Sequence, residues 1–389
     1  MDELTEAPAA LRTSRAAVIE SVETYALRVP LRKPMADATW VRPTWTVPVV
    51  EIRTADGLVG TGCSGVHAGE DLLCLAVMNY HAPLLLGRDA GDIRALWQEL
   101  YWSDVHWVGR GGVVHMAQSM IDIALWDLAA QRAGLPLWQL LGAHHLSLAS
   151  YNTDGGWLNR TVDELVDEMG AMVGQGWDRL KMKVGKADWR EDVDRVRAVR
   201  DALPGHVTLM CDANQGWDLK TALRILPYLE ELELDWIEEP LHPDDVEGHA
   251  RLAAATRIPI AVGESLYSRE VFSQFMSAEA VGVVQTDVTR VAGVTEWLQV
   301  AAEASAHGLW VVPHAGDMMQ VHQHLVAATF ARKPALIEYI PWTLDVYEQP
   351  CRVDHGIVQL PELPGASTRV RGDAREQWEI PGIGGRVSR

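Results

Sequence analysis

Three carboxylates recur at equal intervals in the middle of the chain, each following a short apolar run. Asp212 follows "VTLMC", Glu238 follows "LDWI" and Glu264 follows "IPIAVG", so that 26 residues separate each pair. A carboxylate at a strand end can also cap the next helix, which is the structural alternative for each of them taken singly. Three carboxylates brought together at matching strand ends repel one another unless a cation lies between them. Ligands that are all oxygen favour Mg²⁺ first and Mn²⁺ second.

Two lysines lie one residue apart in the apolar hexapeptide "LKMKVG". In a strand, Lys181 and Lys183 point to the same face. The pair fits either an exposed edge strand, where lysines discourage pairing, or a buried site in which an anion lies between the two ammonium groups. In the second case, the neighbouring charge predicts a lowered pKa for Lys183, which would let it act as a base.

Further polar side chains end other apolar runs. Asp287 and His314 are 27 residues apart, a spacing that lets the carboxylate orient the imidazole as a general base. Asn214 follows Asp212 by two residues and can face the same ligand, and Glu338 ends the last run. If Glu338 is protonated, it could donate a hydrogen bond to an anionic intermediate.

The elements that must position these residues alternate regularly between about residues 146 and 340. Eight short apolar runs alternate with seven amphipathic segments, which predicts parallel strands joined by helices. Eight such units favour a modified TIM barrel of the α/β class, in which strand ends converge on one mouth. A doubly wound open sheet is the alternative, but its GxGxxG is absent after the first strand, where the sequence reads "YNTDGGW".

Three regions follow from these patterns. We expect an α+β capping domain over residues 17–141 and the barrel with its metal site over residues 146–345. Residues 346–389 should form a C-terminal segment that packs on the capping domain and completes it. The loops around "PLRKPMADATWVRPTW" and "GCSGVHAGED" are expected to close over the barrel mouth. Arg32 and Arg42 in the first loop are candidates for substrate binding, with solvated surface charge as the alternative.

Composition excludes several classes of partner. The chain has 389 residues and a formal net charge of −19, which argues against nucleic acid and against anionic membranes. Four cysteines lie far apart without a CxxC motif, and the N-terminus lacks the apolar core of a signal peptide. We therefore expect a cytoplasmic protein with reduced thiols, whose partner is a small molecule.

The motifs "KMKVG", "CDANQGW", "WIEEPL", "VGES", "QTDVTRVAGVTE" and "PHAG", in this order and spacing, resemble the enolase superfamily and its mandelate racemase subgroup. The resemblance extends from about residue 22 to about residue 365. It implies a capping domain on a modified (β/α) barrel, and also a homo-oligomer. Within the subgroup, "YNTDGGW", "KMKVGK" and "DANQGWD" look most like acid-sugar dehydratases acting on galactarate or talarate.

This resemblance also implies a role for each candidate residue. Asp212, Glu238 and Glu264 become the Mg²⁺ ligands. The catalytic group consists of Lys183 as one base, Lys181 as its neighbour, Asp287 with His314 as the opposite pair, and Glu338 as the glutamate of the last strand.

Two bases on opposite faces of a substrate allow more than one reaction. Removal of an α-proton followed by loss of a β-hydroxyl gives a 2-keto-3-deoxy acid, whereas return of the proton by the other base gives an epimer. A dehydratase is the first hypothesis, and a racemase, epimerase or cycloisomerase is the second. A non-catalytic barrel that binds a sugar acid is the third, but the presence of every ligand and both bases counts against it.

Overall fold

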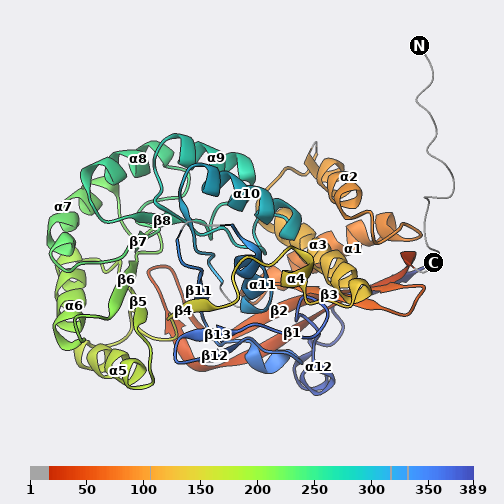
Figure 1. The fold of residues 1–389 in the computed structure, drawn as a ribbon, viewed down its shortest axis with the longest axis horizontal. Helices are drawn as coiled ribbons and strands as arrows, with labels where there is room; N and C mark the ends of the chain where they lie inside the picture. The colour runs from red at the N-terminus through yellow and green to blue at the C-terminus, as the bar shows by residue number, and fades with distance from the viewer. Residues whose placement is uncertain (1–16, 106, 316–317, 331–332) are drawn as a thin grey trace, which may run out of the picture.

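The computed structural model describes residues 17–105, 107–315, 318–330 and 333–389, without the side chains of residues 32–34, 42 and 105. An N-terminal capping domain lies beside a barrel whose helices form an arc outside its strands (Figure 1). The predicted α/β fold, a TIM-type barrel with a capping domain, is confirmed.

The capping domain is built on an antiparallel sheet of four strands in the order β14-β1-β2-β3. These strands are β1 (Ile19–Ala36), β2 (Val41–Thr54), β3 (Val59–Cys63) and β14 (Gly385–Ser388). Helices α1 (Glu70–Leu85), α2 (Ile93–Val105) and α3 (Gly112–Ala133) complete the domain. The last strand thus comes from the other end of the chain and lies against the first (Figure 1).

Glycines set the distance between β3 and α3. A Cβ at Gly62 would lie 1.8 Å from the carbonyl oxygen of Met120, and one at Gly60 would lie 2.2 Å from that of Ala124. Because alternate strand residues face the same side, the pattern "GTG" leaves one face of β3 without side chains. The backbone of the long helix therefore packs directly on the strand.

The barrel has eight parallel strands, in the order β10-β9-β8-β7-β6-β5-β4-β11. They are β4 (Leu148–Asn152), β5 (Arg179–Lys183), β6 (Thr208–Asp212), β7 (Ile237–Glu238), β8 (Ile260–Val262), β9 (Val283–Val284), β10 (Trp310–Val311) and β11 (Leu336–Tyr339). Each one corresponds to a predicted apolar run.

In the described part of the chain, seven helices join these strands, as predicted. They are α5 (Val162–Gly174), α6 (Trp189–Ala202), α7 (Leu219–Glu230), α8 (Val246–Ala255), α9 (Arg269–Ser277), α10 (Val294–Ala306) and α11 (Met319–Ala328). Helix α7 shows why they form, since Ala222, Ile225, Leu226 and Leu229 make one buried stripe with helical spacing. The Asp218 side chain accepts a hydrogen bond from the backbone N–H of Thr221 and begins the helix.

The C-terminal segment contacts both parts of the molecule. Strands β12 (Arg352–Asp354) and β13 (Ile357–Gln359) form a hairpin, and β13 pairs with β4 of the barrel. Helix α12 (Gly372–Trp378) follows, and β14 then joins the capping sheet. The division at residues 141, 146 and 345 stays a prediction.

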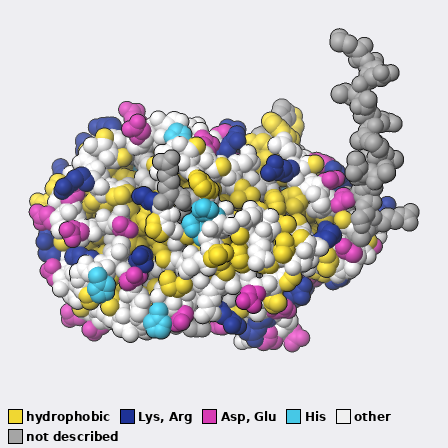
Figure 2. Space-filling model, viewed as in Figure 1, with side chains coloured by type: hydrophobic (Ala, Val, Ile, Leu, Met, Phe, Trp, Pro, Cys, Tyr) yellow, Lys and Arg dark blue, Asp and Glu magenta, His cyan; other side chains and the backbone are white. Residues whose placement is uncertain are grey.

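Charged and apolar side chains are interspersed over the face drawn in Figure 2. The four cysteines are buried and make no disulfide. Among the described residues, no helix combines the length and apolar character needed to cross a bilayer.

Candidate active site

The predicted site residues come together at the C-terminal ends of the barrel strands. Lys183, Asp212 and Glu238 are the last residues of β5, β6 and β7. Glu264, Asp287 and His314 follow β8, β9 and β10 within three residues, and Glu338 lies in β11. Parallel strands bring these ends to one mouth, so residues more than 150 positions apart become neighbours.

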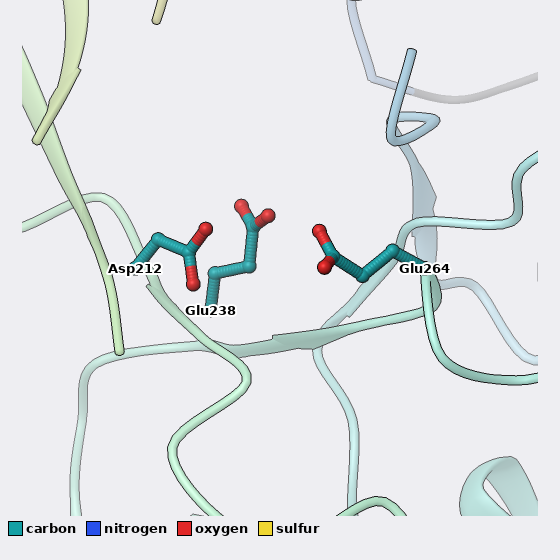
Figure 3. Close-up of side chains that lie close together, drawn as sticks. All are labelled: Asp212, Glu238 and Glu264. Carbon is teal, nitrogen blue, oxygen red and sulfur yellow. The ribbon is translucent and has the colours of Figure 1, made fainter. Parts of the chain in front are cut away.

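The three carboxylates converge on one point. Asp212, Glu238 and Glu264 each offer an oxygen within 4.8 Å of the others, and Figure 3 shows the three carboxylates turned toward one another. Asp212 and Glu238 are buried, while 23% of the Glu264 side chain is exposed. Such a set of converging carboxylate oxygens is the arrangement expected for a hard divalent cation.

Lys181 lies under this group with almost no exposure. Its Nζ donates to both Glu238 oxygens at 2.8 Å and lies 2.7 Å from Glu338 Oε1. Burial alone would lower the pKa of this amine, but Glu238 and then Glu338 raise the pKa well above its ordinary value. Lys181 is therefore a fixed positive charge in the structure.

Lys183 faces the cavity and hydrogen-bonds to Asp212 Oδ2. The sequence led us to expect a lowered pKa. Burial and the charge of Lys181 do lower the pKa of the amine, but the Asp212 carboxylate offsets both, and the pKa lies above its ordinary value. Lys183 is therefore protonated in the structure.

His314 bridges two acidic groups. Its Nδ1 lies 2.8 Å from Asp287 Oδ2, and its Nε2 lies 3.1 Å from Glu264 Oε2. Burial would lower the pKa of the imidazole, but Glu264 and the hydrogen bond to Asp287 raise the pKa to about 10. Asp287 Oδ1 accepts from the backbone N–H and the hydroxyl of Thr289, which fixes the carboxylate. The predicted Asp287–His314 contact is present.

Glu338 is held by three donors. The Thr153 hydroxyl donates to Oε1 at 2.9 Å, the Ala315 N–H donates to Oε2 at 3.0 Å, and Lys181 is the third. Burial would raise the pKa of this carboxyl, but the charge of Lys181 dominates and the pKa falls to about 2. Glu338 is thus ionised in the structure, and the protonated form considered above is not favoured.

Negative charge is in excess at the site. Burial, opposed by Lys181 but reinforced by Asp212, raises the pKa of Glu238 to about 7. Burial and then Glu264 raise the pKa of Glu239 well above its ordinary value. Six carboxylates, namely Asp212, Glu238, Glu239, Glu264, Asp287 and Glu338, meet four basic side chains among the described residues, namely Lys181, Lys183, Arg290 and His314. The donor set fits a divalent cation, which would supply the missing charge.

A cavity of about 280 Å³ opens above these residues. Lys183, Asn214, Glu264, His314 and Glu338 line it from the barrel. Six residues line it from the two predicted loops of the capping domain, which confirms that these loops close the mouth: Met35, Asp37, Thr39, Trp40, Trp45 and His67. Arg32 and Arg42 belong to the same region, but their side chains lie outside the described part of the structure.

The motifs described above assign no role to other residues of the cavity wall. Trp157 lies beside Lys183, whose Nζ is 5.6 Å from the ring centroid, and Trp342 packs edge-on against Trp45 at 5.0 Å. Arg290 also lines the cavity, as its place one helical step after Asp287 allowed, and His67 belongs to the second loop predicted to close the mouth. Trp157 and Trp342 could have been noticed because each follows the end of a barrel strand, β4 or β11, by a few residues.

Comparison with known families agrees with this architecture. The family described as "Enolase C-terminal domain-like" matches residues 164–374. The family "Mandelate racemase / muconate lactonizing enzyme, N-terminal domain" matches residues 19–142.

The chain belongs to the enolase superfamily.

Individual relatives within the enolase superfamily catalyse different reactions. L-talarate/galactarate dehydratase of Salmonella typhimurium is 38% identical over 368 residues, covering 93% of this chain and 91% of the relative. The 3,6-anhydro-alpha-L-galactonate cycloisomerase of Streptomyces coelicolor is 34% identical over 351 residues, covering 90% and 96%. The crystal structure of the Salmonella dehydratase, liganded with Mg and L-lyxarohydroxamate, matches with a TM-score of 0.90 at 35% identity, covering 100% and 99%.

Proposed function

We propose that this protein is a Mg²⁺-dependent acid-sugar dehydratase. It removes the α-proton of a sugar carboxylate and eliminates the β-hydroxyl, giving a 2-keto-3-deoxy acid after tautomerisation. The proposal is supported by the 38% identity to a talarate/galactarate dehydratase and by the site geometry. The observation that carries it is one cavity lined by both Lys183 and His314. Lys183 ends β5 and His314 follows β10, and between these two strands lie β6, β7 and β8, whose C-terminal ends carry the three carboxylates.

Asp212, Glu238 and Glu264 would hold the Mg²⁺ ion. When bound, the ion supplies positive charge that binds the substrate carboxylate, acidifies its α-proton and competes with Lys183 for Asp212. Lys181 adds a fixed charge next to the same point, and this charge stabilises the enediolate more than the starting carboxylate.

Lys183 and His314 move the protons. Lys183 accepts the α-proton at Nζ on one face of the substrate once its own proton is lost. His314 is positively charged at neutral pH and held by Asp287, so its Nε2–H can be donated to the departing hydroxyl. For a substrate of the opposite α-configuration, His314 would accept the α-proton instead, once its own proton is lost.

The substrate we propose is a six-carbon diacid of the galactarate or talarate type. The cavity of about 280 Å³ is small by the standards of ligand pockets, which suits a single sugar acid. We propose that Asn214 hydrogen-bonds to this substrate. The side-chain oxygen of Asn214 is buried at the cavity and has no hydrogen-bond partner among the described residues.

An epimerase or cycloisomerase is the second candidate. The same two bases can take a proton from one face and return it to the other without loss of water. A cycloisomerase relative at 34% identity keeps this reaction class open for the chain.

The test is a screen of the purified protein with Mg²⁺ against mono- and diacid sugars, galactarate and talarate included. Formation of 2-keto acid, followed as the semicarbazone absorbance, is the expected result. Lys183→Ala and His314→Asn should each abolish it, and Glu247→Gln on the exposed side of α8 (Val246–Ala255) is the matched control.

Two other outcomes would contradict dehydration. Exchange of an α-proton in D₂O without a 2-keto acid would support the epimerase or cycloisomerase. Neither exchange nor product across the library, with ligand binding still detected by calorimetry, would support a barrel that only binds a sugar acid.

A further inference from the structure

The loop between β9 and α10 bears directly on the site. It contains Asp287, which orients His314, and Arg290, which lines the cavity. It ends at Gly293, after which α10 starts at Val294. The position of Asp287 therefore depends on what holds this loop at each end.

The far end of the loop is held by the capping domain. Asp122 on α3 accepts two hydrogen bonds from Thr295, from the backbone N–H at 2.9 Å and from the hydroxyl at 2.7 Å. All of these groups are buried, and the two residues are 173 positions apart. Because Gly293 itself provides no capping side chain, the Asp122 carboxylate caps α10 from the other domain.

Two tryptophans of the capping domain support the same contact. Trp126 Nε1–H donates to the Thr295 hydroxyl at 2.9 Å, and Trp97 Nε1–H donates to the carbonyl of Ala292 at 2.8 Å. Gly293 has a φ of 100°, and a Cβ there would lie 2.4 Å from Asp122 Oδ2. The backbone of the loop thus approaches the carboxylate as closely as a glycine permits.

The near end of the loop is held within the barrel. The backbone N–H of Val288 donates to His322 Nε2 at 2.9 Å, and Thr289 donates twice to Asp287. Between these contacts and Gly293 the loop makes one turn, in which the Arg290 and Val291 N–H groups donate to the Asp287 carbonyl. A shift at Gly293 would therefore be transmitted to Asp287 through few residues.

We propose that Asp122 is a positioning residue, which holds the β9–α10 loop so that Asp287 presents His314 to the substrate. This inference rests on the proposed function, since it assigns Asp122 to the His314 half of a two-base site. It also means that the capping domain, besides closing the cavity, fixes the geometry of one base in the barrel.

The experiment compares proton exchange at the two bases. Galactarate and talarate differ in configuration at one carbon, so α-proton exchange in D₂O can be followed by NMR for protons on opposite faces. Lys183→Ala and His314→Asn assign each exchange to its base. Asp122→Ala should slow the His314-dependent exchange about tenfold or more, because small misplacements of catalytic groups cost rate steeply, and should spare the Lys183-dependent exchange.

Two variants control for loss of folding. Asp127→Ala removes another buried carboxylate of α3, one that contacts Thr61 and Ala366 instead of the barrel loop, and should leave the ratio of the two exchanges unchanged. In Asp122→Asn, the amide oxygen can still accept from the Thr295 backbone N–H, and the amide NH₂ can donate to the Thr295 hydroxyl. This variant should restore most of the His314-dependent rate.

Equal slowing of both exchanges, or no slowing, would overturn the proposal. If the wild-type protein forms no 2-keto acid and exchanges no α-proton, the proposed function fails while the positioning contact can still be tested. Amide hydrogen exchange by mass spectrometry should then show faster exchange over residues 285–295 in Asp122→Ala than in Asp127→Ala, and identical exchange would contradict the contact.

Discussion

At the residue scale, the charge of the site depends on what neutralises its carboxylates. Lys181 and Lys183 are both engaged by these groups in the structure, yet Glu238 and Glu239 have raised pKa values. The lysines of "LKMKVG" are therefore not edge-strand protection. They lie in the middle of a barrel, where their same-face spacing places two ammonium groups against the carboxylates of β6 and β7.

A cation should bind at Asp212, Glu238 and Glu264 with measurable affinity. Glu264→Gln should weaken Mg²⁺ binding at least about tenfold in calorimetry, since even groups behind metal ligands contribute on that scale. Addition of Mg²⁺ should raise the melting temperature of the wild-type protein more than that of the variant. Glu247→Gln should bind as the wild type does, and an unchanged affinity in Glu264→Gln would place the ion elsewhere.

His324 should make the fold sensitive to acid. Its Nδ1 accepts a hydrogen bond from the backbone N–H of Trp138 at 3.1 Å, and its Nε2 lies 3.1 Å from the Ser367 hydroxyl. These contacts require the neutral imidazole. Burial lowers the pKa of this imidazole to about 3. In the unfolded chain the same imidazole binds its proton near pH 6.5. The contribution of neutral His324 to the free energy of unfolding is therefore present above pH 6.5 and is lost as pH falls toward 3, roughly 5 kcal/mol in all.

Urea unfolding at several pH values measures this effect. His324→Asn keeps an acceptor for the Trp138 N–H, and its free energy of unfolding should fall less steeply between pH 6.5 and 4 than that of the wild type. Parallel curves for the two proteins would show that His324 does not carry the acid sensitivity.

At the element scale, most of the barrel follows from short-range patterns. Each apolar run of "RLKMKVG" or "VTLMCDAN" type became a parallel strand, because such runs can bury both faces between helices and neighbouring strands. The strand-end positions of Asp212, Glu238 and His314 followed from that order. Contacts between distant elements, such as Asp122 with Thr295 or β13 with β4, have no such pattern and could not be predicted.

The close packing of β3 on α3 should be intolerant of side chains. Gly62→Ala would place a Cβ against the Met120 carbonyl, a backbone atom that cannot rotate away, and should cost about 2 kcal/mol of unfolding free energy in urea. Gly170→Ala on the exposed side of α5 meets no atom within 4 Å and should leave the stability unchanged or slightly raised. A neutral result for Gly62→Ala would mean that the helix can move off the strand.

At the scale of the whole molecule, the site depends on both domains. The barrel supplies the ionisable groups, and the capping domain supplies much of the cavity wall through Trp40, Trp45 and His67. The sequence predicted that the loops would close the mouth and made Trp40 and Trp45 candidates for its wall. It could not separate them from tryptophans of the core, because aromatic residues are as frequent in cores as in cavities. The homo-oligomer implied by the resemblance stays a prediction, which light scattering can test.

Removal of residues 385–389 should destabilise the capping domain. β14 pairs with β1 from Ser21 to Thr24, and without it β1 would become an open sheet edge. The melting temperature should fall by several degrees and aggregation should increase. Arg386→Ala leaves the backbone pairing in place and should melt close to the wild type, so a similar loss in both would point to the side chain instead.

The pairing of β14 with β1 also orders the events of folding. Thr24 and Gly385 are hydrogen-bonded although 361 residues separate them, so this sheet cannot be completed until nearly the whole chain has left the ribosome. The barrel lies between the two strands in sequence and can begin to fold earlier. Loop closure over such a length is slow, so completion of the capping sheet should be a late kinetic phase, and mature activity should lag behind formation of the barrel.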